Sequence, residues 1–192
     1  MGTRPLRDAP RDLSSIASLE ESLILPHFTS DDAFSIGVAI RHRLRSLSNL
    51  AAVVSISLAN TNNLLFHATS RPGIQPDNDI WVSRKRKTVL RWGVSTWFMH
   101  NKFKGDEAEF ARKYGLGGEA GSYAIHGGGV PIRVQGVEGI VGVLVVSGLK
   151  QQEDHMVVIE ALEEFLEQER RGADGSRGLE REGSDGSTLH ER

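Results

Sequence analysis

The sequence predicts an α+β fold, namely a three-layer α/β/α domain built on a five-stranded, mostly antiparallel sheet. Stretches with strand-like patterns occur both before and after a long helical stretch. The stretch at 140–147 is apolar on both faces, as is typical of a central strand covered by helices on both sides. A chain of 192 residues with 39% hydrophobic residues fits one such domain with polar ends.

The N-terminal half predicts two helices and a hairpin. Residues 1–12 are polar and form an expected flexible lead-in, and 13–25 favour a short helix. Thr29 and Asp32 have the spacing of a capping box, and the apolar residues that follow recur at helical intervals. Two alternating stretches with an Asn-rich turn between them predict a β-hairpin, with strands at 51–58 and 64–68.

The C-terminal half predicts three helices and three strands. The helices are a long one, a short one stopped by Gly115 and a final amphipathic one, at 79–103, 107–114 and 152–170. The strands are at 122–126, 130–134 and 140–147. After residue 170 large apolar side chains are almost absent, so we expect a folded domain at 13–170 and a disordered tail at 171–192.

Composition excludes several classes of protein. The net charge of -2 and the pI near 6.4 provide no basic field for nucleic acid. No cysteine is present, which excludes disulfides and thiolate sites and suits a reducing compartment. No apolar run approaches the ~20 residues of a membrane helix, and the N-terminus lacks the apolar core of a signal peptide. We therefore expect a cytoplasmic protein.

Two features near the centre of the chain indicate a ligand site. Arg84, Lys87 and Arg91 share a helix face, which is either a solvated face or an anion site. Glycines at 127–129 let a backbone approach a ligand and offer N–H groups to an anion. The N–H groups at the start of the final helix add to the same positive electrostatic field. The candidate ligand-binding residues are Trp81, Arg84, Lys85, His126, Gly127, Gly128, Gly129, Asp154 and His155.

The histidines have two interpretations. His126 and His155 are either structural or surface residues, or ligands of a metal or a haem. No pair or trio of residues has metal-site spacing, so no metal site is predicted. The run that begins at His126 has the letters of an esterase oxyanion-hole motif, but the sequence has no Gly-x-Ser-x-Gly elbow to accompany it.

Residues 34–165 resemble the haem-degrading-domain superfamily, which includes HbpS-like and GlcG-like proteins, and most closely its uncharacterised fungal and bacterial branch. Three runs carry the resemblance: WVSRKRKTV at 81–89, HGGGVPI at 126–132, and VSGL at 146–149 followed by Gln152, Asp154 and His155. The resemblance implies a profilin-like domain that forms homo-oligomers, at least dimers. It also implies haem as a candidate ligand. It supplies no catalytic residue.

Three functions remain open from the sequence. The first is an oligomeric binding protein for a small anionic ligand, with a tetrapyrrole as one candidate. The second is a protein-interaction scaffold without a small ligand. The third is an enzyme that uses His126 or His155 as an acid or a base.

Overall fold

A four-stranded antiparallel sheet forms the centre of the computed structural model, which describes residues 4–47 and 49–182, with only the backbone for 173–182. The strands are β1 (Val53–Leu58), β2 (Leu64–Thr69), β3 (Gly129–Ile132) and β4 (Gly142–Ser147). They lie in the order β2-β1-β4-β3, and β1 and β2 form the predicted hairpin. β4 pairs with β1 and β3 on its two sides, which confirms its central place.

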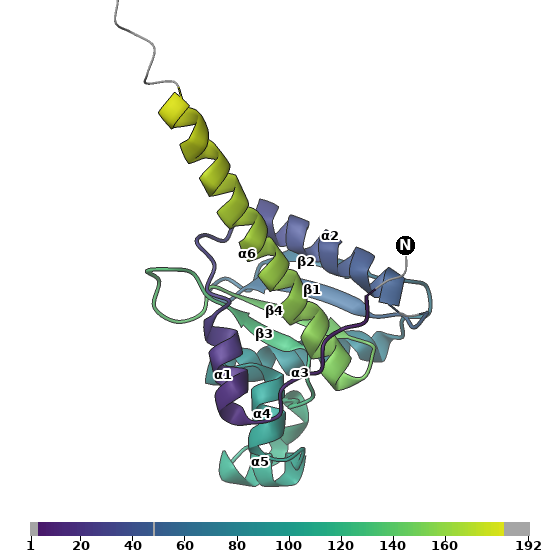
Figure 1. Cartoon of the computed structure of the whole chain (residues 1–192). Coiled ribbons are helices and arrows are strands. Elements are labelled where there is room, and N and C mark those ends of the chain that lie inside the picture. The colour runs from purple at the N-terminus through teal and green to yellow at the C-terminus, as the bar shows by residue number, and fades with distance from the viewer. Residues whose placement is uncertain (1–3, 48, 183–192) are drawn as a thin grey trace, which may run out of the picture.

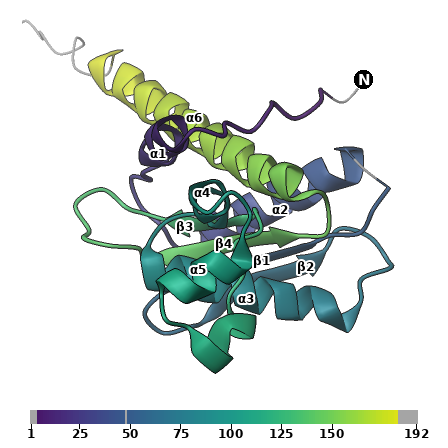
Figure 2. The ribbon, with the colours of Figure 1, turned by 90° about the horizontal axis from the view of Figure 1, so that it is seen from below.

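Helices cover both faces of this sheet (Figures 1 and 2). α2 (Ser30–Leu47) and α6 (Gln151–Glu182) lie on one face, and α3 (Pro76–Trp92) lies on the other. The remaining helices are α1 (Leu13–Glu21), α4 (Thr96–Lys102), α5 (Glu107–Lys113) and the 3-10 helix η1 (Gly117–Ser122). No helix of the described residues is long and apolar enough to cross a membrane.

Side chains of β4 alternate between two hydrophobic cores. Leu144 and Val146 pack in the large core with α2 and α6, whereas Val143 and Val145 pack against Val82 and Val89 of α3. All the side chains of β4 are buried. An apolar pattern without alternation is therefore the correct signature for this strand, because both of its faces are covered.

The predicted fifth strand at 122–126 is wrong, and the sheet has four strands in the described chain. Residue 122 still belongs to η1, and the next residues, Tyr123 to Ile125, are buried without joining the sheet. The backbone N–H of Ala124 donates to Thr88 Oγ1 of α3 over 3.1 Å. A side chain on a neighbouring helix thus takes the place of a strand partner, and sequence alternation does not reveal that.

The predicted long helix at 79–103 is two helices. Gly93 adopts a left-handed conformation with φ of 66° and ends α3, and its N–H donates to Val89 O over 2.8 Å. Ser95 then caps α4 by accepting from the N–H of Phe98 over 2.9 Å. α3 also begins before residue 79, at Pro76, where the N–H of Gln75 donates to Asn78 Oδ1 over 3.0 Å.

The predicted capping box of α2 is confirmed. The N–H of Thr29 donates to Asp32 Oδ2 over 2.7 Å, and the N–H of Asp32 donates to Thr29 Oγ1 over 3.3 Å.

The C-terminal end of the chain differs from expectation. The prediction that α6 ends near residue 170 is wrong, since the helix continues to Glu182 and projects beyond the domain (Figure 1). The rest of the predicted tail, 183–192, lies outside the described residues.

Residues 4–12, which we expected to be a flexible lead-in, run along α6 as a strap (Figure 2). The guanidinium of Arg7 pairs with Glu160 and Glu163 of α6. The indole N–H of Trp97 donates to Pro10 O over 2.7 Å. The N-terminal segment, here called the strap, therefore makes specific contacts with both α6 and α4.

Candidate functional site

A cavity of about 510 Å³ opens where β4 ends and α6 begins, against the first turns of α3. Its volume lies in the range of small-molecule sites. It brings together four of the nine predicted site residues: Trp81, Lys85, His126 and Asp154. The other lining residues are Asn78, Ser147, Gly148, Leu149, Lys150, Gln151 and Gln152.

A buried ion pair forms part of the cavity wall. Lys85 and Asp154 are each only 2% exposed, and Lys85 Nζ lies 3.1 Å from Asp154 Oδ2. Lys85 Nζ also donates to Val146 O over 2.9 Å. The Asp154 carboxylate accepts the backbone N–H groups of Gly148 and Leu149 over 3.3 and 3.0 Å. The pair thereby joins α3, the end of β4 and the start of α6.

Burial pushes both members of this pair toward their neutral forms. Desolvation lowers the pKa of the Lys85 amine and raises the pKa of the Asp154 carboxyl, because a charge is costly away from water. The attraction between the two groups opposes both shifts, as do the two amides that Asp154 accepts. Lys85 is therefore a desolvated amino group paired with Asp154, and its pKa lies below the ordinary value for lysine.

The aromatic wall of the cavity consists of Trp81 and His126, whose ring centroids lie 4.9 Å apart at an interplanar angle of 73°. The Trp81 indole N–H donates to Asp77 Oδ2 over 2.9 Å, which fixes the ring one turn from the start of α3. His126 Nδ1 lies 3.3 Å from Glu107 Oε1, an ion-pair distance when the imidazole is protonated. This arrangement leaves Nε2 as the ring nitrogen available to a ligand.

The glycine corner is adjacent to the cavity but has a packing role. Gly128 has φ of 118°, and a Cβ there would lie 2.3 Å from Val146 O and 2.9 Å from Lys85 Nζ. The N–H of Gly127 donates to Gln151 Oε1 over 3.3 Å, and that of Gly129 donates to Thr96 Oγ1 over 2.9 Å. These two amides already have acceptors within the protein, so neither is free to bind an anion in this arrangement.

The cation face of α3 lies away from the cavity. Arg84 Nε donates to Tyr123 O over 3.0 Å, and Arg91 Nη1 donates to the Tyr123 hydroxyl over 2.9 Å. Lys87 Nζ lies 4.6 Å from the Tyr123 ring centroid. The Arg84 guanidinium also stacks on the Trp81 ring, 4.4 Å from its centroid. Arg84 thus supports the Trp81 wall from behind and does not line the cavity.

His155 is also outside the cavity. It is 0% exposed, and neither of its ring nitrogens has a hydrogen-bond partner in the described part of the chain. Its ring stacks on Trp97, with centroids 5.9 Å apart. Burial lowers its pKa to about 3, so the ring is neutral in the folded protein. The hypothesis that His155 shares a site with His126 is not supported by this geometry.

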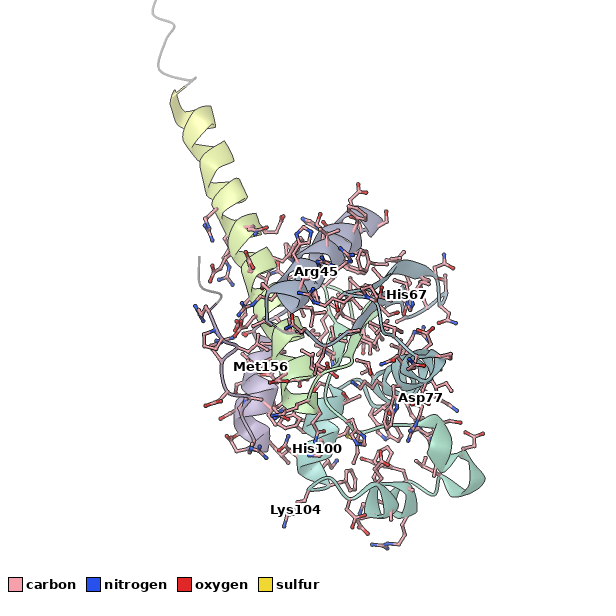
Figure 3. The ribbon with its side chains drawn as sticks, turned by 90° about the vertical axis from the view of Figure 1, so that its right-hand side faces the viewer. Arg45, His67, Asp77, His100, Lys104 and Met156 are labelled. Carbon is pink, nitrogen blue, oxygen red and sulfur yellow. The ribbon has the colours of Figure 1, made fainter. Side chains whose placement is uncertain are left out.

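Most of the cavity residues that sequence reasoning missed lie in one segment. Residues 147–152 form the junction between β4 and α6 and contribute more than half of the lining. The signal was present in the sequence, because polar residues return there directly after a buried strand. Gln151 also connects the cavity to α4, since its Nε2 lies 3.3 Å from His100 Nε2. Figure 3 labels His100 on α4 and Met156 on the adjacent helix α6.

A second cavity of about 570 Å³ lies behind the same junction. Strap residues 5–9 form one side of it. Leu149, Lys150 and Gln152 line both cavities, so the junction is a shared wall between them. Within the residues that the structure describes, no group of three or more His, Asp or Glu side chains is arranged to hold a metal ion.

Comparison with known proteins gives the family. A family model described as "Haem degrading protein HbpS-like" matches residues 28–163. The chain is 40% identical to a UPF0303 protein of Streptomyces avermitilis, over 82% of this chain and 92% of that protein. It is 38% identical to a UPF0303 protein of Brucella anthropi, over 84% of this chain and 92% of that protein. The chain belongs to the HbpS-like family, as the sequence motifs indicated.

Solved structures share the fold. The crystal structure of the Ybr137w protein is 34% identical in sequence and has a TM-score of 0.76, covering 85% of this chain and 91% of its own. The crystal structure of HbpS is 18% identical with a TM-score of 0.53, covering 71% and 87% of the two chains. At that identity the likeness to HbpS concerns the fold alone.

Proposed function

We propose that this protein is a cytoplasmic, homo-oligomeric binding protein for a small, flat, anionic ligand, with a tetrapyrrole as the leading candidate. The observation that carries the proposal is the cavity that brings Trp81, His126 and Lys150 together at the start of α6. Trp81 and His126 provide a ring wall for a flat molecule. The family model's description, a haem-degrading protein, supplies the candidate.

The main positive charge for an anion comes from Lys150, next to the start of α6, and not from the α3 cations. Lys150 is exposed at the rim, and α6 begins at the next residue. The N-terminus of a helix carries a partial positive charge that favours an anion. Glu153 and Asp154 in the first turn reduce this field. Lys150 therefore has to provide the main attraction for a carboxylate of the ligand.

A haem fits the side chains of the cavity. His126 is the one histidine among the lining residues, and its Nε2 would hold the haem iron. Lys150 would pair with a propionate. A bound haem supplies a redox-active iron, whereas these residues bind and orient it.

A haemin titration tests this proposal. The absorption spectrum of haemin should shift on binding, and His126→Ala should weaken binding about tenfold or more, which corresponds to at least ~1.4 kcal/mol. Lys150→Ala should weaken binding less and make it less sensitive to salt. The matched control is His42→Ala, on the exposed side of α2, which should bind as the wild type does. Equal haemin affinity in His126→Ala and wild type would refute the assigned site.

The oligomer part of the proposal rests on exposed apolar side chains beside the edge strand β2, and not on the tryptophans. Trp97 is 1% exposed, and the half-buried Trp92 packs among the rings of Phe110, Tyr114 and Tyr123. Exposed apolar side chains instead flank the edge strand β2: Phe34 on α2, Leu64 on β2 and Ile80 on α3 are 62%, 60% and 56% exposed. An apolar surface beside an open strand edge is typical of a subunit contact.

A further inference from the structure

We propose that Lys85 is a carbonyl-reactive amine, whose Nζ forms an imine with an aldehyde or ketone in the cavity while Asp154 transfers the protons. This inference rests on the proposed ligand cavity and names a chemical class for its occupant. The ligand would then be a flat anionic molecule that carries a carbonyl group.

The position of Lys85 is the first support. Its side chain is 3% exposed, yet it lines the cavity together with Asp154. A neutral amine at this position has two N–H groups, which can be directed at Val146 O and Asp154 Oδ2. The lone pair of the nitrogen then remains for a molecule in the cavity. Val146 O and the carboxylate together hold Nζ in place, which reduces the entropy lost when a bond forms there.

The protonation state is the second support. An ordinary lysine with a pKa of ~10.4 is neutral in only about one molecule in 2,500 at pH 7. Burial lowers the pKa of Lys85 and raises the pKa of Asp154, so both shifts favour an amine beside a carboxylic acid. A neutral amine is the nucleophile that imine formation needs, and a neutral carboxylic acid is the proton donor.

The reaction balances with these two groups alone. The lone pair of Nζ attacks the carbonyl carbon and forms the C–N bond, the carbonyl oxygen takes the proton of the Asp154 carboxyl, and the nitrogen returns a proton to the carboxylate. Asp154 then protonates the hydroxyl of the resulting carbinolamine. One water leaves, the nitrogen lone pair forms the C=N bond, and the protonated imine remains beside the Asp154 carboxylate at the 3.1 Å separation of the present pair.

The neighbouring residues fit this role. The N–H groups of Gly148 and Leu149 hold the Asp154 carboxyl toward Lys85. The absence of a side chain at Gly128 keeps a carbon atom from within 2.9 Å of Nζ. Trp81 and His126 offer a wall for the ring of an aromatic aldehyde.

Pyridoxal 5′-phosphate, a flat anionic aldehyde, is the probe for the test. The full-length protein is incubated with it at pH 7, reduced with borohydride and mapped by peptide mass spectrometry. The chain has six lysines, so every site can be compared: Lys85, Lys87, Lys102, Lys104, Lys113 and Lys150. We expect Lys85 to carry on the order of tenfold more label than any other lysine, because burial lowers the pKa of its amine and the cavity holds the aldehyde beside it. Its share of the label should fall at pH 9.5, because a higher pH makes amines of ordinary pKa more reactive.

Matched variants and an unreactive analogue complete the design. Lys113→Arg, at an exposed position of α5, should leave the label on Lys85 unchanged, whereas Asp154→Asn should slow labelling at least about tenfold. Label on Lys150 or on exposed lysines in preference to Lys85 would overturn the inference. 4-Pyridoxic acid is a flat anion that has a carboxylate in place of the aldehyde of the probe and a hydroxyl in place of its phosphate. If it competes with haemin while Lys85 stays unlabelled, the binding function stands and the imine inference fails. Labelled Lys85 without any haemin or 4-pyridoxic acid binding would overturn the binding function alone.

Discussion

His155 should make the folded protein sensitive to acid. Its ring is fully buried, without a partner for either nitrogen among the described residues, and its pKa falls to about 3 from an unfolded value of 6.5. The unfolded chain therefore binds a proton below pH 6.5 that the folded chain excludes down to about pH 3. Stability is lost as the pH falls through this window, because protonation favours the unfolded state.

The size of the effect follows from the two pKa values. Between pH 7.5 and pH 5, His155 should remove about 2 kcal/mol of unfolding free energy, and by pH 4 about 3 kcal/mol. The perturbation is His155→Leu, which keeps an apolar side chain of similar volume against Trp97. The variant should therefore lose about 2 kcal/mol less than the wild type over the first interval.

Urea unfolding followed by tryptophan fluorescence, at fixed protein concentration and at several pH values, measures this difference. Other titrating groups, including Lys85 and Asp154, are common to both proteins and cancel in the comparison. His42→Leu on the exposed side of α2 is the control and should follow the wild-type curve, because an exposed ring loses little hydration on folding. If the wild-type and His155→Leu curves run parallel from pH 7.5 to pH 4, the folded protein protonates His155 and the reasoning is wrong.

Three further predictions follow from the packing, the tail and the exposed apolar surface. Gly128→Ala should lower the unfolding free energy by about 2–4 kcal/mol, because φ is 118° and the new methyl group would lie 2.3 Å from Val146 O. The control, Gly118→Ala, adds a methyl group with nothing within 4 Å and should be near neutral in the same denaturation assay. Similar effects of the two changes would contradict this account. Deletion of 171–192 should leave the melting temperature unchanged, and a large decrease would show that this segment docks on the domain. Light scattering should give a multiple of 21.1 kDa, which Phe34→Ser combined with Leu64→Ser should reduce; a wild-type mass of one chain at micromolar concentration would exclude the oligomer.

The elements with strong local patterns were predictable from the sequence. The alternation that predicted β1 and the capping box of Thr29 and Asp32 both describe interactions between near neighbours in the chain, and both are confirmed. Two errors came from contacts that the pattern does not contain. Gly93 is tolerated in many helices but here takes a left-handed conformation that ends α3. Residues 122–126 have a strand-like composition, yet Thr88 on α3 takes the backbone hydrogen bond of Ala124.

The candidate site was predictable in part for the same reason. Trp81, Lys85, His126 and Asp154 were each identified from local composition, and the structure gathers them around one cavity. The pairing of Lys85 with Asp154 spans 69 positions of sequence, so no local rule predicts that the lysine charge is neutralised. Helical spacing grouped Arg84 with Lys87 and Arg91, but the position of Tyr123 decides where these cations lie.

The shared wall between the two cavities has a practical consequence for anyone who produces this protein. The strap lines the rear cavity, and Leu149, Lys150 and Gln152 line both cavities. A purification tag or fusion partner attached ahead of residue 1 would disturb the position of the strap. Because the two cavities share residues, it would also disturb the cavity in which ligand binding is measured. The opposite end of α6 projects away from the domain (Figure 1). Fusions placed at the C-terminus are therefore the appropriate format for affinity measurements. A difference in ligand affinity between N-terminal and C-terminal fusions would measure how strongly the strap affects the cavity.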